Sequence, residues 1–214
     1  MATFHRKRKP PDGKDPRWYK DCLRIDFQCR CAYCLIHEKD YQGHLSFQVD
    51  HFKPQSKFLQ LERVYSNLYY SCQVCNGPGH KGDSWPEPEE QAMGMRFVDP
   101  CLEDWETHIV FHRDGSVVHA TAAGRYSIDT LGLARPQLIA HRMENPAEYY
   151  ARSLLRKMQG QLNRISRIAS KAQPKLEMGK TVQQLREALQ GIRIQVGKAW
   201  NEKKPIYDPP DCPY

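Results

Sequence analysis

The chain has 214 residues, with 32 Lys and Arg against 25 Asp and Glu and a formal net charge of +7. Its mean hydropathy of −0.75 indicates a polar chain, and no apolar run approaches the ~18–20 residues of a membrane span. Hydrophobic residues make up 40% of the sequence, which argues against a fully disordered chain. The basic N-terminus is followed by no apolar stretch, so we expect no secretory signal and a cytoplasmic protein without a membrane partner.

The surplus positive charge is confined to one part of the chain. Residues 1–134 carry 17 basic and 18 acidic side chains, whereas residues 135–204 carry 15 basic and 5 acidic ones. The segment 135–204 is therefore the main candidate for contact with a polyanion, and Arg6–Lys9 is a second, local one. An ordinary solvated surface is the alternative for both segments.

The first elements are expected in the N-terminal half. Residues 1–14 indicate a flexible basic arm, because they combine many charges with Pro10-Pro11-Asp12-Gly13. A helix is expected over 15–27, with Asp15 as its N-cap and Pro16 in its first turn. Alternating polarity predicts a strand over 44–49 that continues into Asp50 and His51. A loop with a short helical turn should follow over 54–66.

Later elements are mostly helical. We expect a short helix within 67–82, an acidic and proline-rich surface loop over 84–106, and a hairpin over 108–120 around Asp114-Gly115. A short turn capped by Ser127 should run to Leu133. Amphipathic helices are predicted over 136–171, interrupted near Pro146, and over 181–201. The two should pack antiparallel, ahead of a tail over 205–214.

Two C-x-x-C pairs indicate a metal site. Four thiolates, from Cys31, Cys34, Cys72 and Cys75, suit the closed tetrahedral coordination of structural Zn²⁺. Cys29 could compete with Cys31 for a ligand position. The remaining cysteines, Cys22, Cys101 and Cys212, have no partner in the sequence pattern, and we expect them to be small buried apolar residues.

Further polar residues are interleaved with these pairs. Asp50-His51 is followed by Pro54 and then by Asn67-Leu68, while Asn76 follows the second pair directly and Lys81 comes shortly after. In this order the residues resemble the HNH (ββα-metal) endonuclease family. The resemblance implies an α+β fold: a zinc-stabilised HNH module over 15–106, a hairpin with a basic helical region over 107–204, and the tail.

The resemblance also implies a division of roles. His51 would be the general base for phosphodiester hydrolysis, Asn67 would orient its loop, and Lys81 would contact phosphate. Asp50 and Asn76 or His80 would hold a catalytic Mg²⁺ or Mn²⁺. Four residues separate Asn76 from Lys81, where many family members have two, so the sequence leaves open which of Asn76 and His80 is the second ligand.

A looser similarity extends beyond the module. Segments 97–104 and 128–136, with the hairpin between them, resemble the HNH subunit of Septu-like or retron-associated anti-phage systems, which works beside an ATPase subunit. DNA is the expected substrate, and an RNA-cleaving effector is an alternative. Two further alternatives are a nucleic-acid-binding subunit with an inactive site and a subunit whose basic helices dock a partner.

Overall fold

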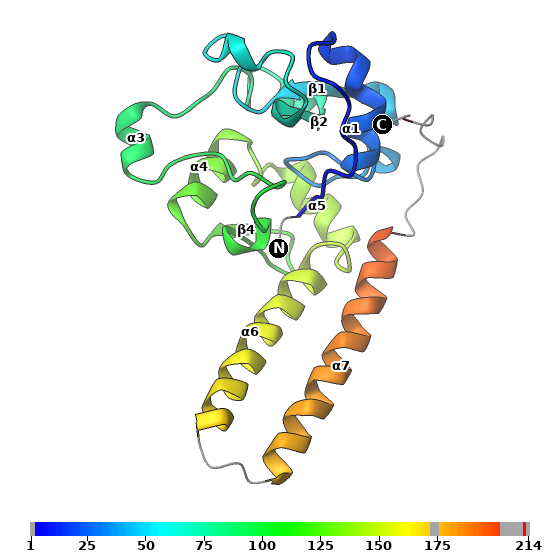
Figure 1. Cartoon of the computed structure of the whole chain (residues 1–214), viewed down its shortest axis with the longest axis vertical. Coiled ribbons are helices and arrows are strands. Elements are labelled where there is room, and N and C mark those ends of the chain that lie inside the picture. The colour runs from blue at the N-terminus through cyan, green and yellow to red at the C-terminus, as the bar shows by residue number, and fades with distance from the viewer. Residues whose placement is uncertain (1–2, 172–175, 202–211, 213–214) are drawn as a thin grey trace. The chain divides into compact units, whose positions relative to one another are not determined.

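The computed structural model describes residues 3–171, 176–201 and 212, which form a mixed α+β fold (Figure 1). The described residues fall into two compact units. The first comprises residues of 1–110 and 117–138 together with Cys212, and the second comprises residues of 111–116 and 139–203. None of the helices among the described residues is long and apolar enough to cross a membrane.

A two-stranded antiparallel sheet lies at the centre of the first unit. Strand β1 (Phe47–His51) pairs with β2 (Leu68–Cys72), with Phe47 opposite Cys72 and His51 opposite Leu68. Helix α2 (Gln73–Asn76) follows β2 directly and contacts both strands. The β1–β2–α2 order is therefore the ββα arrangement that the motif implies. Strand β2 is buried along its whole length. A fully buried strand need not alternate polar and apolar residues, so the sequence pattern did not predict it.

The expected first helix begins where predicted but is split. A 3-10 turn over Pro16–Tyr19, capped by the Asp15 side chain, leads into α1 (Lys20–Asp26). Cys22 of this helix is buried, as expected, but it is joined to Cys212 by a disulfide, which the sequence pattern did not indicate. The two cysteines are 190 residues apart, and only the fold brings them together. Cys101 is free and half-buried.

The N-terminal segment is packed rather than a free arm. Phe4 is buried and its ring lies 5.0 Å from the ring of Phe27. The backbone N–H groups of Lys7 and Arg8 both donate to the Asp26 carboxylate. The expectation of a flexible arm overlooked these partners because they lie well away in the sequence.

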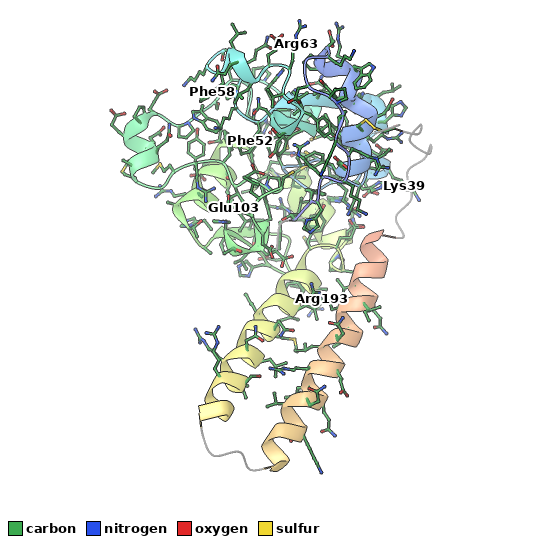
Figure 2. All side chains as sticks on the ribbon, viewed as in Figure 1. Lys39, Phe52, Phe58, Arg63, Glu103 and Arg193 are labelled. Atoms are coloured by element: carbon green, nitrogen blue, oxygen red, sulfur yellow. A yellow bond between two sulfur atoms is a disulfide. The ribbon has the colours of Figure 1, made fainter. Side chains whose placement is uncertain are left out.

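Several short elements surround the sheet. Further 3-10 turns are found at Glu38–Asp40, His44–Ser46, Leu59–Leu61, Tyr65–Asn67 and Trp105–Thr107. Helix α3 (Pro88–Ala92) lies within the expected acidic loop and is stabilised by a capping box between Glu87 and Glu90. Figure 2 shows Phe52, the residue after β1, among the packed side chains of this unit, and Phe52 is buried.

The predicted hairpin is present, and a helix follows it. Strands β3 (Ile109–Phe111) and β4 (Val117–His119) flank the turn at Asp114 and Gly115. Helix α4 (Ala122–Thr130) is capped by Thr121, not by Ser127. The Ser127 hydroxyl is buried and accepts a hydrogen bond from the Val98 N–H. Ser127 is thus a core residue within the helix.

The basic region is helical, as expected. It contains α5 (Pro136–Glu144), α6 (Tyr150–Lys171) and α7 (Leu176–Asn201), with the break near Pro146. Figure 1 shows α6 and α7 side by side, and Arg186 donates to Ser166 across this antiparallel pair. Helix α7 begins five residues before the predicted Thr181. The predicted tail lies outside the described residues except for Cys212.

Candidate active site and metal centre

The four predicted zinc ligands form one buried cluster. The sulfur atoms of Cys31, Cys34, Cys72 and Cys75 all lie within 4.8 Å of one another. A tetrahedral ion with Zn–S bonds of about 2.3 Å would separate its sulfurs by about 3.8 Å. The Cys34 and Cys72 sulfurs are 3.8 Å apart, so the cluster fits structural zinc.

The electrostatics of the cluster also favour a cation. Burial acts to raise the pKa of the Cys31 thiol, but hydrogen bonds from the other three thiols hold it well below its usual value. The same bonds to Cys31 raise the pKa of Cys72 and Cys75. The ionisation of these thiols is therefore interdependent. A divalent cation allows the thiols to ionise together.

Cys29 does not belong to the cluster. It is buried, and burial raises the pKa of its thiol to about 11. Its backbone N–H bonds to the Arg24 carbonyl, which turns the chain before the first C-x-x-C pair. The Ala32 N–H then bonds to the Tyr70 carbonyl of β2. The first pair is thereby fixed to the strand that leads into the second.

One arginine from outside the motif reaches the cluster. The Arg135 guanidinium donates to the Cys75 sulfur at 3.4 Å and to the carbonyls of Leu131 and Gly132. Burial opposes ionisation of Arg135, yet the charge of the neighbouring cysteines raises its pKa. This contact places a permanent positive charge beside a ligand sulfur.

A pocket of about 300 Å³ lies at the end of β1. Its lining includes Asp50, His51, Asn76 and Asp83, which supply carboxylate, imidazole and amide groups. Oxygen donors of this kind are those that Mg²⁺ prefers. The residues present therefore fit a hard divalent cation. Asp83 is exposed, and the sequence pattern did not identify it as a candidate site residue.

His51 is held in one tautomer. Its Nε2 lies 2.9 Å from the carbonyl oxygen of Glu62. Because a carbonyl can only accept, Nε2 carries the proton in the neutral ring and Nδ1 has a free lone pair. His51 lines the pocket and is half-buried. The arrangement is suited to accepting a proton at Nδ1.

Asn67 fastens the loop between the strands. Its side-chain oxygen accepts from the Lys53 N–H, and its amide nitrogen donates to the carbonyls of Lys53 and Leu61. Its backbone carbonyl also accepts from Phe52. Leu61 precedes Glu62, so Asn67 restrains the carbonyl that holds His51.

Lys81 is placed differently from the expectation of a phosphate contact. Its side chain is fully buried, and Nζ lies 3.0 Å from Asp50 Oδ1 and 2.6 Å from the His51 carbonyl oxygen. The other Asp50 oxygen accepts from the Tyr33 hydroxyl. Burial raises the pKa of Asp50, an effect that Lys81 opposes. Lys81 thus supports Asp50 from inside the protein, and its contact with phosphate stays a prediction.

Asn76 and His80 lie in different surroundings. Asn76 lines the pocket and donates to the Gln48 side chain. Helix α2 ends at Asn76, and extended backbone at Gly77 breaks the helical register. The His80 ring instead lies against Gly132, where a Cβ would come within 2.5 Å of it. Burial and the Arg135 charge lower the pKa of His80. Of the two alternatives for the second ligand, Asn76 lines the pocket and His80 is not among its lining residues, which favours Asn76.

Comparison with known proteins identifies the module. Residues 31–82 match the family model described as HNH endonuclease, a span that begins at Cys31 and includes the pocket residues up to Gly82. No curated protein matches the chain. The chain therefore contains an HNH endonuclease domain, built on a ββα core with a buried four-cysteine cluster.

Proposed function

We propose that the protein is a metal-dependent endonuclease that hydrolyses phosphodiester bonds of DNA. The observation that carries the proposal is the pocket in which His51, tautomerically fixed by Glu62, lies beside Asp50 and Asn76. In this proposal Asp50 and Asn76 hold the divalent cation, and His80 does not. The cation, when bound, supplies positive charge to stabilise the phosphate and the departing oxygen.

The proposed reaction is a single displacement at phosphorus. Nδ1 of His51 takes a proton from a water molecule while the oxygen of that water attacks phosphorus. The bond from phosphorus to the 3′ oxygen breaks, and that oxygen takes up a proton. The products are a 5′-phosphate and a 3′-hydroxyl end. Asn67 acts on the reaction indirectly, by holding the loop that carries the Glu62 carbonyl.

Cleavage assays test this proposal directly. Purified protein with Mg²⁺ or Mn²⁺ should cut double-stranded DNA, and single-stranded DNA and RNA serve as comparison substrates. His51→Ala should abolish cutting with zinc content and folding unchanged. His119→Ala, which removes an exposed histidine of β4, is the matched control and should cut normally. Cutting by His51→Ala at the wild-type rate would show that the mechanism is wrong.

The basic helices are proposed to bind the substrate backbone. Arg164 and Arg167 of α6 and Arg193 of α7 are exposed, and Figure 2 labels Arg193 on its helix. Reversing Arg164 and Arg167 to Glu should weaken DNA binding and flatten its salt dependence, by about 0.9 in the logarithmic slope for each phosphate that is no longer neutralised. The double variant Lys14→Glu/Lys39→Glu, at exposed positions of the first unit, changes the net charge by the same amount and is the control.

A partner protein is a second candidate for the same helices. Large apolar side chains on α6 and α7 are 39% to 51% exposed, among them Leu154, Met158, Ile165, Leu185, Ile192 and Ile194. Exposed aliphatic residues at helical spacing suit protein contacts better than phosphate contacts. The proposal that the partner is an ATPase of an anti-phage complex rests on the looser resemblance over 97–136. Co-purification with the product of an adjacent ATPase gene would support the ATPase as partner. If the salt dependence of DNA binding is unchanged in the Arg164/Arg167 variant, partner docking is favoured over nucleic-acid binding as the role of the helices.

A further inference from the structure

The N-terminal segment 4–13 lies outside the matched HNH span but contacts it closely. Its centre is Arg6, whose guanidinium donates to the carbonyls of Tyr65, Ser66 and Leu68, the last at 2.6 Å. These three acceptors flank Asn67. A single arginine therefore binds the backbone on both sides of the residue that fastens the catalytic loop.

Aromatic rings enclose the same guanidinium. Its central carbon lies 5.2 Å from the ring centroid of Phe27, 5.1 Å from that of Tyr65 and 4.8 Å from that of Tyr69. Tyr65 and Tyr69 are both buried. The planar fork of an arginine can stack on rings and donate in its plane at once, whereas a lysine offers a single ammonium. The site thus suits an arginine better than a lysine.

Two more contacts fix the segment to the same stretch of chain. The Asp12 carboxylate accepts from the Tyr65 N–H at 2.7 Å, and the Gly13 N–H donates to the Arg63 carbonyl at 2.9 Å. Asp26 joins the two chain segments, since it accepts from the Lys7 N–H and from the Tyr65 hydroxyl. Residues 63–68 are therefore held from the N-terminal side along their whole length.

The held stretch adjoins the residue that binds His51. It begins directly after Glu62, whose carbonyl binds His51 Nε2, and it contains Asn67, which bonds to Lys53 and Leu61. We propose that residues 4–13 form a positioning strap, with Arg6 as its central residue, that keeps Glu62 and hence His51 in the geometry needed for proton transfer. This inference rests on the proposed nuclease function. It assigns the basic residue Arg6 to positioning and not to phosphate binding.

Amide hydrogen exchange and kinetics test the strap in the full-length protein. Arg6→Met removes the donors, Arg6→Lys keeps only the charge, and Lys9→Ala removes an exposed charge nearby as the matched control. Exchange in the peptide covering residues 56–68 should accelerate in both Arg6 variants and stay unchanged in Lys9→Ala. The maximal cleavage rate should fall by about tenfold to a hundredfold in the Arg6 variants, because the base is displaced. The Kd for DNA should stay within about twofold, because the guanidinium binds carbonyls of the protein and not phosphates.

The outcomes separate the strap from the nuclease proposal. Unchanged exchange and cleavage in Arg6→Met would overturn the strap, as would full rescue of both by Arg6→Lys. A weakened Kd with a normal maximal rate would instead assign Arg6 to substrate binding and also overturn it. Amide exchange can be measured in a protein that does not cleave nucleic acid. If the wild-type protein cuts no nucleic acid, the nuclease proposal is refuted. The exchange data then still show whether Arg6 holds residues 63–68. If Arg6→Met does not fold, Asp12→Ala, which removes one hydrogen bond of the strap, takes its place with the same expectations.

Discussion

The Lys81 ammonium lies 3.0 Å from the Asp50 carboxylate, and both side chains are buried. The two residues are 31 positions apart in the sequence, one in β1 and one in the turn after α2. Their contact joins the pocket to the protein interior, and Tyr33 extends it to the first C-x-x-C pair. The Asp50 carboxylate is thus oriented by the buried side chains of Lys81 and Tyr33.

Lys81→Met should destabilise the protein strongly. Removing one partner of a buried ion pair leaves the other charge uncompensated, which costs about 3–5 kcal/mol. Urea unfolding measures the loss. Lys57→Met is the matched control, because Lys57 pairs with Glu87 at 2.9 Å on the surface and should contribute less than about 1 kcal/mol. A small effect of Lys81→Met on stability, together with a flatter salt dependence of DNA binding, would restore the phosphate-contact assignment.

Zinc should be present at one ion per chain and should require Cys72 but not Cys29. Cys72→Ser removes a thiolate from the cluster and should abolish stoichiometric zinc, with loss of folding free energy. Cys29→Ser, at a buried cysteine outside the cluster, should retain the ion. Elemental analysis of the purified proteins gives the answer. Loss of zinc in Cys29→Ser alone would reassign the ligand set.

Arg135→Met should weaken zinc retention without removing a ligand. Outer contacts to metal ligands typically alter affinity by about 10- to 100-fold, and Arg135 donates directly to the Cys75 sulfur. Competition with a chromogenic chelator measures the change. Arg125→Met removes an exposed arginine of α4 and should leave the competition curve unchanged. Identical curves for the two variants would show that the Arg135 contact does not affect the metal.

The Cys22–Cys212 disulfide should stabilise the folded chain. It closes a loop with a sequence separation of 190 residues, and cross-links across loops of this order are expected to contribute up to about 5 kcal/mol through the entropy of the unfolded chain. Cys212→Ser should lower the Tm, and a phosphine reductant should lower the Tm of the wild type but not of this variant. Cys101→Ser should leave the Tm of the oxidised protein nearly unchanged. Two free thiols at 22 and 212 in oxidised protein, found by mass spectrometry, would contradict the pairing.

Much of the site could be predicted because its functional residues occur in short sequence motifs. A C-x-x-C turn presents two thiolates whatever surrounds it, and this predicted the cluster at Cys31, Cys34, Cys72 and Cys75. Asp50 and His51 are adjacent on one strand and line the same pocket. The hairpin at Asp114-Gly115 and the break near Pro146 follow from backbone preferences of single residues.

The features that the sequence did not indicate involve partners far away in the sequence. Continued helix would place His80 on the same face as Asn76, but α2 ends at Asn76 and the His80 ring packs on Gly132. The family resemblance implied a phosphate contact for Lys81, and lysines are normally exposed, whereas the structure buries Lys81 against Asp50. Arg6 looked like part of a charged arm, and its three carbonyl acceptors lie about 60 residues away.

By itself the sequence determined the types of side chain that the chemistry needs: four thiolates, an aspartate beside a histidine, and an asparagine between them and the second cysteine pair. The tertiary structure alone decided which polar groups are exposed and which are paired in the interior. It buried Lys81 against Asp50, placed the His80 ring against Gly132, and joined Arg6 to the backbone carbonyls that flank Asn67. The physical reason is that coordination chemistry depends on residue type at short spacing, whereas burial and ion pairing depend on contacts that the chain makes only once it has folded.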